Sequence, residues 1–504
     1  MTQVNLNNNK MNRRDTGFVL GPVFFLVLLL VPLPGGVPPE AMRVAAITAL
    51  MATWWITEAI PIPATSLLPI VLFPLMGVMD GSKVTIAYGN HLVFLFMGGF
   101  FIAVTVEKWN LHRRIALHTI RLVGVTPERI ILGMMLATAF LSMWISNLAA
   151  TMMMMTIGMA VLQQTTDQLE KFAIEIDTRK GHYKFGIAMM LGIAYAASIG
   201  GISTLVGTAP NALFAGIVEQ HYGTTISMVS WMMFAFPLAV LMLFITWFYL
   251  TRIIYPCEMD HLPGGYEMIH AQIKELGPVS TAEIRISFIL VLVAGLWILN
   301  GLLDITALRL VKDSTIAIFG ALLLFFIPAN YKKREFLLDW QTAVSIPWDI
   351  LILFGGGFAL ALGFSESGLT HVIAEQLALL KGASIVVIIV VVTTMVIFLT
   401  EVTSNTATAS IMLPIMLALA EAMQVHPYGI MLAAVIAASF AFMLPVATPP
   451  NAIIFGSRYV TMPQMVVAGF WLNIIGIILI STFVLLLLPV VWNIDISVFP
   501  HEFE

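Results

Sequence analysis

The chain has 504 residues, of which 59% are hydrophobic and 10% are charged. Soluble globular proteins average about 45–50% apolar and about 25% charged residues, so this composition excludes an ordinary soluble protein. The net charge of −4 offers no basic surface for nucleic acid, and the single cysteine excludes a disulfide framework, a thiolate zinc site and an iron–sulfur cluster. The composition therefore indicates an all-α integral membrane protein.

Apolar stretches long enough to cross a bilayer, which takes about 20 residues per helix, recur along the chain. They predict about eleven transmembrane helices. The first, near 16–33, follows a polar tail and has no signal-peptidase cleavage pattern, so we expect it to be retained. The others are expected near 41–57, 64–79, 91–107, 185–205, 225–250, 286–303, 313–328, 349–364, 427–445 and 463–489.

Two further apolar stretches, 128–163 and 384–424, are too long for one span and too short for two. Each is interrupted at its centre by polar residues, which include a Ser-Asn pair at 146–147 and another at 404–405. Polar backbone at membrane depth is tolerated where it is buried in protein, so each stretch predicts a re-entrant hairpin of two half-helices. A single kinked span is the alternative explanation.

The positive charges support this topology. With a cytoplasmic N-terminus and both stretches as hairpins, 19 of the 24 Lys and Arg residues fall on the cytoplasmic side, the side that positive residues favour. We therefore expect a multi-pass protein of the inner (plasma) membrane with its C-terminus outside. The five residues expected on the outer side are Arg43, Lys83, Arg309, Lys312 and Lys381.

The sequence repeats itself, mostly at a separation of 258 residues. Because five spans separate the two starts, the second copy is expected upside down in the membrane, as in secondary transporters that bind substrate at the interface of the repeats. A channel could also carry such a duplication. The matched segments are 95–100 with 353–358, 140–142 with 398–400, 146–147 with 404–405 and, at a separation of 240, 206–211 with 446–451. The predicted organisation is a cytoplasmic tail (1–15), a first transmembrane helix (16–36), repeat 1 (37–258), a cytoplasmic linker (259–285), repeat 2 (286–492) and an outside tail (493–504).

Each Ser-Asn pair stands just before the second arm of its predicted hairpin. Ser and Asn are good helix N-caps, which is the purely structural explanation. A helix N-terminus at mid-membrane also presents free N–H donors and a partial positive charge that suit a carboxylate. Two such ends would hold an anion with a negative group at each end. Neither tip has Lys or Arg nearby, so a co-bound cation such as Na⁺ is expected to offset the charge.

The Gly-Thr-Ala-Pro-Asn motif at 207–211 and the Ala-Thr-Pro-Pro-Asn motif at 447–451 place helix breakers inside apolar segments. Proline frees backbone carbonyls, and free carbonyls at membrane depth are the oxygen ligands that hard cations prefer. A kinked helix satisfied by Ser or Thr neighbours is the alternative. Because the motif is duplicated, as the tips are, a binding site is the better interpretation.

These residues resemble the divalent anion/sodium symporter family, which includes the bacterial INDY dicarboxylate transporters and animal sodium-coupled dicarboxylate, citrate and sulfate carriers. The resemblance covers essentially the whole chain. It is carried by the Trp-Trp-Ile-Thr-Glu-Ala-Ile-Pro motif at 54–61, the two Ser-Asn tips and the Leu-Pro-Val-Ala-Thr-Pro-Pro-Asn segment at 444–451. It implies a homodimer whose transport domains move as elevators against scaffold domains. It also implies that Na⁺ is co-transported rather than held as a fixed cofactor.

The resemblance also implies roles for individual residues. The substrate carboxylates would meet Ser146, Asn147, Leu148 (through its backbone N–H), Ser404, Asn405 and Thr406, with Thr448 and Pro449 lining the pocket. A first sodium site would use Ser142, Ser146, Asn147 and Gly207. A second would use Thr400, Thr403, Asn405 and Ala447. Both sodium sets remain polar or small here, which favours symport over sodium-independent exchange.

One position departs from the family pattern, because Leu148 stands where a threonine would follow the first Ser-Asn pair. The expected function is Na⁺-coupled symport of C4-dicarboxylates such as succinate, malate and fumarate. Citrate, sulfate or another divalent anion, or exchange without sodium, remain alternatives within this class. An anion channel, or an enzyme using Glu401 with Asn405, are alternatives from other classes. No nucleophile–base pair is visible, so no catalytic residue is predicted.

Overall fold

The computed structural model describes residues 13–31, 37–172, 176–259, 265–302, 310–377 and 382–503. Residues 1–12 of the predicted tail, and the predicted outer residues Arg309 and Lys381, lie outside these ranges. Within them the chain is almost entirely helical, in agreement with the predicted fold class. A small antiparallel pair of strands, β1 (Pro328–Asn330) and β2 (Glu335–Phe336), is the one sheet recorded in the described ranges.

The helices follow one another with short connections. In chain order they are α1 (Arg13–Leu30), α2 (Pro39–Thr57), α3 (Ile62–Thr65), α4 (Leu68–Leu75), α5 (Gly81–Tyr88), α6 (His91–Lys108), α7 (Leu111–Val123), α8 (Pro127–Ser142), α9 (Asn147–Lys171), α10 (Lys184–Gly201), α11 (Ala209–Tyr222), α12 (Met228–Phe248, continued by a π-helix Tyr249–Ile254), α13 (Gly265–Glu275), α14 (Thr281–Leu302), α15 (Asp313–Phe326), α16 (Trp340–Ala343), α17 (Trp348–Glu366), α18 (Leu369–Leu377), α19 (Ile385–Thr400), α20 (Asn405–Met423), α21 (Pro427–Ala438), α22 (Pro449–Gly456) and α23 (Met462–Trp492).

Eight helical segments in the described part of the chain are long and apolar enough to cross a membrane, and four more apolar helices are shorter. Six of the eight coincide with predicted spans. The other two, α9 and α20, are the second arms of the predicted hairpins. The predicted span 64–79 is divided into α3 and α4, because Pro61 and Pro69 each start a new helix there. The predicted span 286–303 begins five residues earlier, at Thr281.

Both apolar stretches with polar centres form two helices each, as predicted. The first divides into α8 and α9, and both arms pack against α10. The second divides into α19 and α20, and both arms pack against α21. A single kinked span would carry its two halves to opposite ends of the neighbouring helix, so these contacts favour the hairpin over the kink.

The duplication seen in the sequence is present in the order of the helices. The seven helices from α6 to α12 correspond in order to the seven from α17 to α23, and α8 and α19 are both 16 residues long. Phe96 on α6 and Phe354 on α17 are equivalent at the separation of 258, and their rings pack edge to face at 4.7 Å. Contact between equivalent residues is the mark of a two-fold relation between halves.

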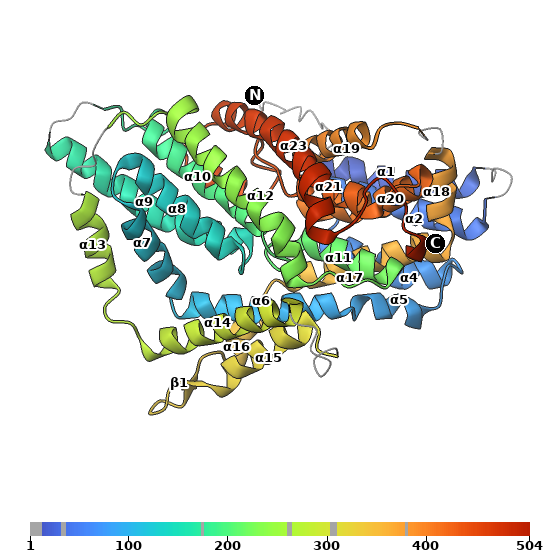
Figure 1. Ribbon diagram of the computed structural model, residues 1–504, viewed down its shortest axis with the longest axis horizontal. Helices are drawn as coiled ribbons and strands as arrows, with labels where there is room; N and C mark the ends of the chain where they lie inside the picture. The colour runs from blue at the N-terminus through green and yellow to red at the C-terminus, as the bar shows by residue number, and fades with distance from the viewer. Residues whose placement is uncertain are drawn as a thin grey trace, which may run out of the picture.

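The two halves interlock. In Figure 1, α7, α8 and α9 lie toward one end of the molecule and α18 and α20 toward the other, with α10, α12 and α21 between them. Helix α9 of the first hairpin contacts α22, and α20 of the second hairpin contacts α11. Each hairpin therefore packs against the short helix that belongs to the other repeat.

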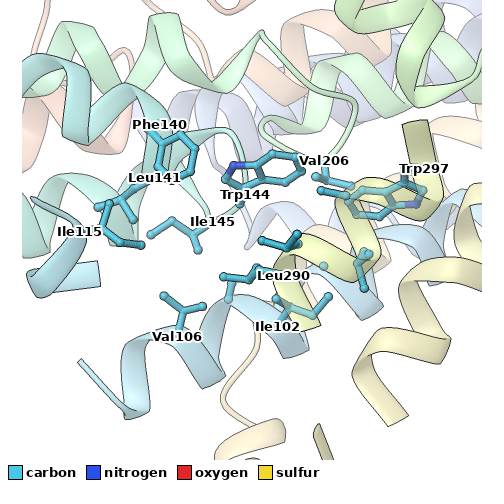
Figure 2. Close-up of a pocket in the computed structure, with 15 residues that line it drawn as sticks. Ile102, Val106, Ile115, Phe140, Leu141, Trp144, Ile145, Val206, Leu290 and Trp297 are labelled. Atoms are coloured by element: carbon cyan, nitrogen blue, oxygen red, sulfur yellow. The ribbon is translucent and has the colours of Figure 1, made fainter. Parts of the chain in front are cut away.

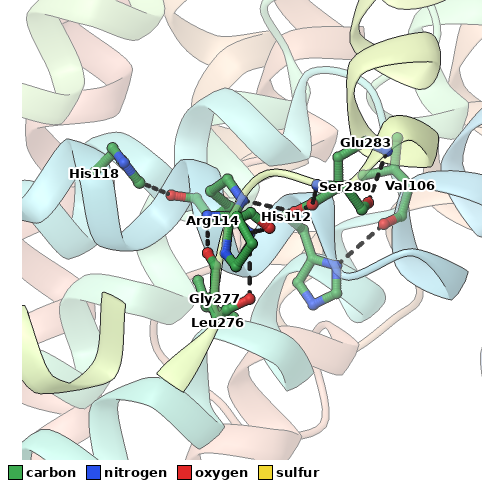
Figure 3. A network of polar contacts seen from close by, with 9 residues as sticks. Val106, His112, Arg114, His118, Leu276, Gly277, Ser280 and Glu283 are labelled. Carbon is green, nitrogen blue, oxygen red and sulfur yellow. Dashed lines mark hydrogen bonds and ion pairs between the residues drawn. The ribbon is translucent and has the colours of Figure 1, made fainter. Parts of the chain in front are cut away.

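An ion pair joins α7 to the start of α14 (Figure 3). The Arg114 guanidinium donates to both oxygens of Glu283, at 2.6 and 3.3 Å, and also to backbone carbonyls of residues 276–278. The Glu283 carboxylate accepts a further bond from the backbone of Ser280 at 2.6 Å. This network explains why α14 begins before the predicted boundary, since its first turn is fixed by a charged partner on another helix.

Candidate substrate and cation site

The first hairpin tip turns at Ser146. Helix α8 ends at Ser142 and α9 begins at Asn147, so four residues make the turn. The Ser146 hydroxyl accepts from the backbone N–H of Ala149 at 3.2 Å, which is the N-cap role that its residue type favours. The side chain of Leu148 is 44% exposed, so it does not close the tip by packing into the protein.

Four oxygen atoms converge behind this tip. The Ser142 hydroxyl lies 2.6 Å from Asn147 Oδ1 and 2.7 Å from the carbonyl oxygen of Ala197 on α10. Asn147 Oδ1 also lies 3.2 Å from the Ala197 oxygen and 3.3 Å from the Gly207 oxygen. A hydroxyl carries one proton, so it cannot donate to two oxygens at once. The cluster therefore needs a further hydrogen-bond donor.

The amide of Asn147 supplies that donor. Rotating it by half a turn places its N–H₂ where Oδ1 stands, and the amide then donates to Ser142, Ala197 and Gly207. In this orientation the oxygens of Ser142, Ala197 and Gly207 each face an amide donor.

The second tip repeats this geometry. Helix α19 ends at Thr400 and α20 begins at Asn405. The Thr400 hydroxyl lies 2.9 Å from Asn405 Oδ1 and 2.7 Å from the carbonyl oxygen of Ala438 on α21. The same argument about a single proton applies here. Unlike Ser146, the equivalent Ser404 makes no side-chain cap, so its hydroxyl is available to a ligand.

The two proline motifs form breaks between paired helices, as predicted. The first separates α10 from α11 and the second separates α21 from α22. The Asn211 amide donates to carbonyls of the first break, with the shortest bond, 2.7 Å, to Thr204. Asn451 does the same in the second break, at 3.0 Å from Ala441 and Leu444. Each motif asparagine therefore fixes backbone carbonyls of its own break.

Glu401 holds the second tip to the second break. Its two carboxylate oxygens accept from the backbone N–H groups of residues 442–444 at 2.8–3.0 Å and from the Asn473 amide at 2.8 Å. Every partner is a donor, an arrangement that favours an ionised carboxylate, and Glu401 directly follows Thr400 in the chain. In the first repeat the residue equivalent to Glu401 is Met143, whose side chain cannot make such bonds. The first tip and the first break are joined by the Thr204 hydroxyl, which donates to the Met143 carbonyl at 2.5 Å.

The expectation that neither tip has a cation nearby is wrong for the second tip. Arg13, at the start of α1, donates to the backbone carbonyl of Val402 at 2.7 Å and also to that of Ile56. Val402 lies two residues before Ser404, at the C-terminal end of α19, where a positive charge is favourable. Arg13 and Val402 are 389 residues apart in the chain. No local sequence pattern could have connected them.

The structure brings together part of each predicted set. In the first sodium set it joins Ser142, Asn147 and Gly207, while Ser146 serves as the cap. In the second it joins Thr400 and Asn405. Thr403 instead bonds Leu399 and Thr408 within its own hairpin, and Ala447 bonds Leu444 within its break.

The predicted substrate residues differ in their exposure. Asn405 and Thr448 are buried, Pro449 and Leu148 are exposed, and Ser146, Asn147, Ser404 and Thr406 are half-buried.

The sequence analysis missed the carbonyls of Ala197 and Ala438. A signal for them exists, because Ala196-Ala197-Ser198 and Ala437-Ala438-Ser439 are a further duplicated triplet, at a separation of 241. The hydroxyls of Ser198 and Ser439 are both buried without a hydrogen-bond partner. A backbone ligand has no residue-type signature of its own, so the duplication was the only clue.

The two half-sites belong to one packed unit. Tyr195 on α10 donates its hydroxyl to the Phe442 carbonyl in the second break at 2.9 Å. Ala197, two residues along α10, contributes to the first oxygen cluster, and the Phe442 N–H binds Glu401 beside the second cluster. Among the described residues no three His, Cys, Asp or Glu side chains gather to hold a metal. Any cation here would be held by neutral oxygens.

Duplicated re-entrant hairpins, broken helices and paired oxygen clusters define a secondary membrane transporter. Comparison with known proteins agrees: residues 14–494 match the family described as "Sodium:sulfate symporter transmembrane region". The chain belongs to this divalent anion/sodium symporter family. It is 46% identical over 486 residues, 95% of this chain and 92% of the other, to proteins named "Sodium-dependent dicarboxylate transporter SdcS" from Staphylococcus aureus strains RF122 and MRSA252.

Solved structures share the fold at low sequence identity. The Neisseria gonorrhoeae protein MtrF superposes with a TM-score of 0.55 at 14% identity, covering 93% of this chain and 95% of that one. The Alcanivorax borkumensis YdaH transporter gives a TM-score of 0.53 at 13% identity, covering 93% and 97%. These matches support the architecture of a helical membrane transporter, and the family assignment makes the chain a transporter rather than an enzyme.

Proposed function

We propose that this protein is a Na⁺-coupled symporter of C4-dicarboxylates such as succinate, malate and fumarate, located in a bacterial plasma membrane. The observation that carries the proposal is the duplicated oxygen cluster, Ser142–Asn147–Ala197–Gly207 in one repeat and Thr400–Asn405–Ala438 in the other. The relatives named as sodium-dependent dicarboxylate transporters supply the substrate class.

Sodium binding follows from the composition of each cluster. The ligands are hydroxyl, amide and backbone oxygens, which suit a hard cation and hold a monovalent one without adding net charge. Glu401 adds one negative charge beside the second cluster, so the second site is expected to bind sodium more tightly than the first. Thr403 and Ala447 complete the second site, and Ser146 the first, by small movements when the ion binds.

The dianion binds between the two tips. Ser146 and Asn147 at one tip, and Ser404, Asn405 and Thr406 at the other, present hydroxyl and amide donors. The first-turn N–H groups of α9 and α20, including that of Leu148, present backbone donors. Thr448 and Pro449 line the pocket. Sodium ions behind both tips offset the two carboxylates, which couples anion binding to the ions without a basic side chain in the pocket.

The movement we propose is an elevator. The hairpins with α10, α11, α21 and α22 would form the transport domain, and a homodimer of scaffold domains would hold it in the membrane. The two repeats are inverted in this proposal, with the N-terminus cytoplasmic and the C-terminus outside. The repeat, linker and tail boundaries are those predicted from the sequence.

The test is uptake of radiolabelled succinate into proteoliposomes with and without an inward sodium gradient. We expect uptake that requires sodium and is competed by malate and fumarate. Sodium-independent counterflow would remove symport while keeping the family, and preference for citrate or sulfate in the same assay would replace the substrate.

Two substitutions test the site itself. Asn147→Ala and Asn405→Ala each remove an oxygen that faces both ion and substrate, so each should abolish uptake while the melting temperature stays close to that of the wild type. Normal transport by either variant would contradict the assigned site.

A further inference from the structure

A cavity of about 220 Å³ lies beside the first tip and is separate from the oxygen clusters. Figure 2 shows side chains of four segments around it: Ile102 on α6, Phe140 on α8, Trp144 in the tip, and Leu290 and Trp297 on α14. All of its lining residues are Gly, Ala, Val, Ile, Leu, Phe or Trp, and none of them carries a charge. It therefore has no means to bind a dianion or a sodium ion.

The cavity opens to an apolar part of the protein surface. Two of its lining residues are exposed, Phe140 by 48% and Val291 by 73%. Val291 lies on α14, one of the helices long and apolar enough to span the membrane, and Phe288 one turn before it is 64% exposed. The mouth of the cavity is thus part of the exposed apolar face of a helix that is long and apolar enough to cross a membrane.

The chemistry of the cavity selects its occupant. Apolar cavities stay dry, because a water molecule inside them finds too few polar partners. The bilayer at its mouth offers flexible hydrocarbon chains that are thin enough to enter and that match the apolar lining. We infer that one acyl chain of a membrane lipid occupies this cavity and packs against Trp144 and Val206.

The position of the occupant gives it a role. Trp144 lies two residues before the Ser146 cap, and Val206 directly precedes Gly207 of the first oxygen cluster. An acyl chain packed on both Trp144 and Val206 would hold the first tip and the first break at the separation that the first oxygen cluster needs. This role rests on the proposed function, whereas occupancy by lipid does not.

The protein carries its own reporters of occupancy. The indoles of Trp144 and Trp297 stack in the wall of the cavity, with ring centroids 6.1 Å apart and planes within 3°. Bromine atoms on a lipid chain quench indole fluorescence on contact. The full-length protein is reconstituted in phosphatidylcholine whose acyl chains are brominated at mid-chain, and its quenching is compared with that of a double variant, Trp144→Phe with Trp297→Phe. The double variant should lose a strongly quenched component.

Filling the cavity tests the assignment directly. Ala294→Phe places a ring in the cavity and should remove most of the quenching of these two indoles, and the smaller filler Ala294→Leu should remove part of it. Leu299→Phe, exposed on α14 outside the cavity, is the matched control and should change nothing. Unchanged quenching in both Ala294 variants, with normal melting temperatures, would overturn the proposal. Equal quenching of the wild type and the double variant would also overturn the proposal, since it would show that no lipid chain contacts Trp144 or Trp297.

A second measurement tests the link to transport. Ala294→Phe should raise the sodium concentration for half-maximal uptake by about fivefold, the lower range of typical coupling between two sites, and Leu299→Phe should leave it unchanged. Lost quenching with unaltered sodium dependence would refute the role at the tip. If the wild type shows no sodium-dependent uptake, the proposed function fails and the quenching experiment still decides whether the lipid binds.

Discussion

Replacing Glu401 by glutamine tests whether the second tip depends on a buried charge. The carboxylate joins the hairpin to the break that follows α21 through the backbone N–H groups of residues 442–444 and through Asn473. Glutamine has the same shape, but one of its two positions is an NH₂ that donates. Whichever way the amide stands, it meets at least one backbone N–H that has lost its acceptor.

The magnitude follows from these contacts. An unsatisfied buried donor costs about 1–3 kcal/mol, and hydrogen bonds to a charged group are worth about 1.5–3 kcal/mol, so the ordered break should lose roughly 2–3 kcal/mol. This corresponds to roughly a 30- to 140-fold change in an equilibrium constant. Since the break carries Ala447 and packs beside Thr400, the loss should appear as weaker sodium binding.

Sodium-dependent succinate uptake in proteoliposomes is the assay. Glu401→Gln should raise the half-saturating sodium concentration by up to that factor. Asn473→Ala, which removes one donor and keeps the charge, should raise it much less. Melting temperatures measured by intrinsic fluorescence separate weaker ion binding from unfolding. If Glu401→Gln keeps both the sodium dependence and the melting temperature of the wild type, the reasoning is refuted.

Three further predictions concern other parts of the molecule. Arg13→Gln removes the cation from the second tip and should lower succinate uptake, whereas Arg14→Gln, which loses only an exposed ion pair with Glu58, should not; equal effects would contradict a role at the tip. Arg114→Lys keeps the charge but loses the forked contact with Glu283, so the free energy of unfolding should fall by about 3 kcal/mol and the melting temperature should fall with it. An unchanged melting temperature would be evidence against the network. Burial lowers the pKa of His426 from its ordinary value of 6.5 to about 4, so the folded protein binds fewer protons than the unfolded chain. The contribution of neutral His426 to the free energy of unfolding is complete above the pKa of the unfolded chain. It falls as the pH is lowered toward the pKa of the folded protein, by about 1.4 kcal/mol between about pH 7.5 and about pH 5.5. His426→Asn keeps a helix-capping residue and should melt with less dependence on pH over that range; the same dependence in both proteins would show that another group titrates.

Much of the architecture was predictable because the sequence carries it in local patterns. Apolar stretches with a polar centre predicted the hairpins. Their helices begin and end within a few residues of the predicted bounds, except that α9 continues to Lys171. The repeat is read from an ungapped match. The α8–α9 and α19–α20 tips therefore stand where the pattern placed them, at Ser146-Asn147 and Ser404-Asn405.

The rest depends on contacts between distant segments. The carbonyls of Ala197 and Ala438 reach the clusters because α10 and α21 pack against the hairpins, and any residue could supply such an oxygen. The early start of α14 depends on Arg114, about 170 residues away in the chain. The contact of Arg13 with the second tip crosses almost the whole chain. Such relations come from tertiary packing, which no periodicity encodes.

The donors that the Asn147 amide presents to Ser142, Ala197 and Gly207 bear on how an empty carrier returns to its starting state. After cargo is released, the protein must travel back with nothing bound, and bare oxygens pressed together would resist that return by mutual repulsion. A side chain that swaps an acceptor for a donor removes the repulsion at once, with no change in the backbone. Asn147→Asp has no amide donor to present to these oxygens. It should therefore slow the return of the empty carrier more than the movement of the loaded carrier. Net uptake of succinate should then fall, while exchange of labelled for unlabelled succinate is retained.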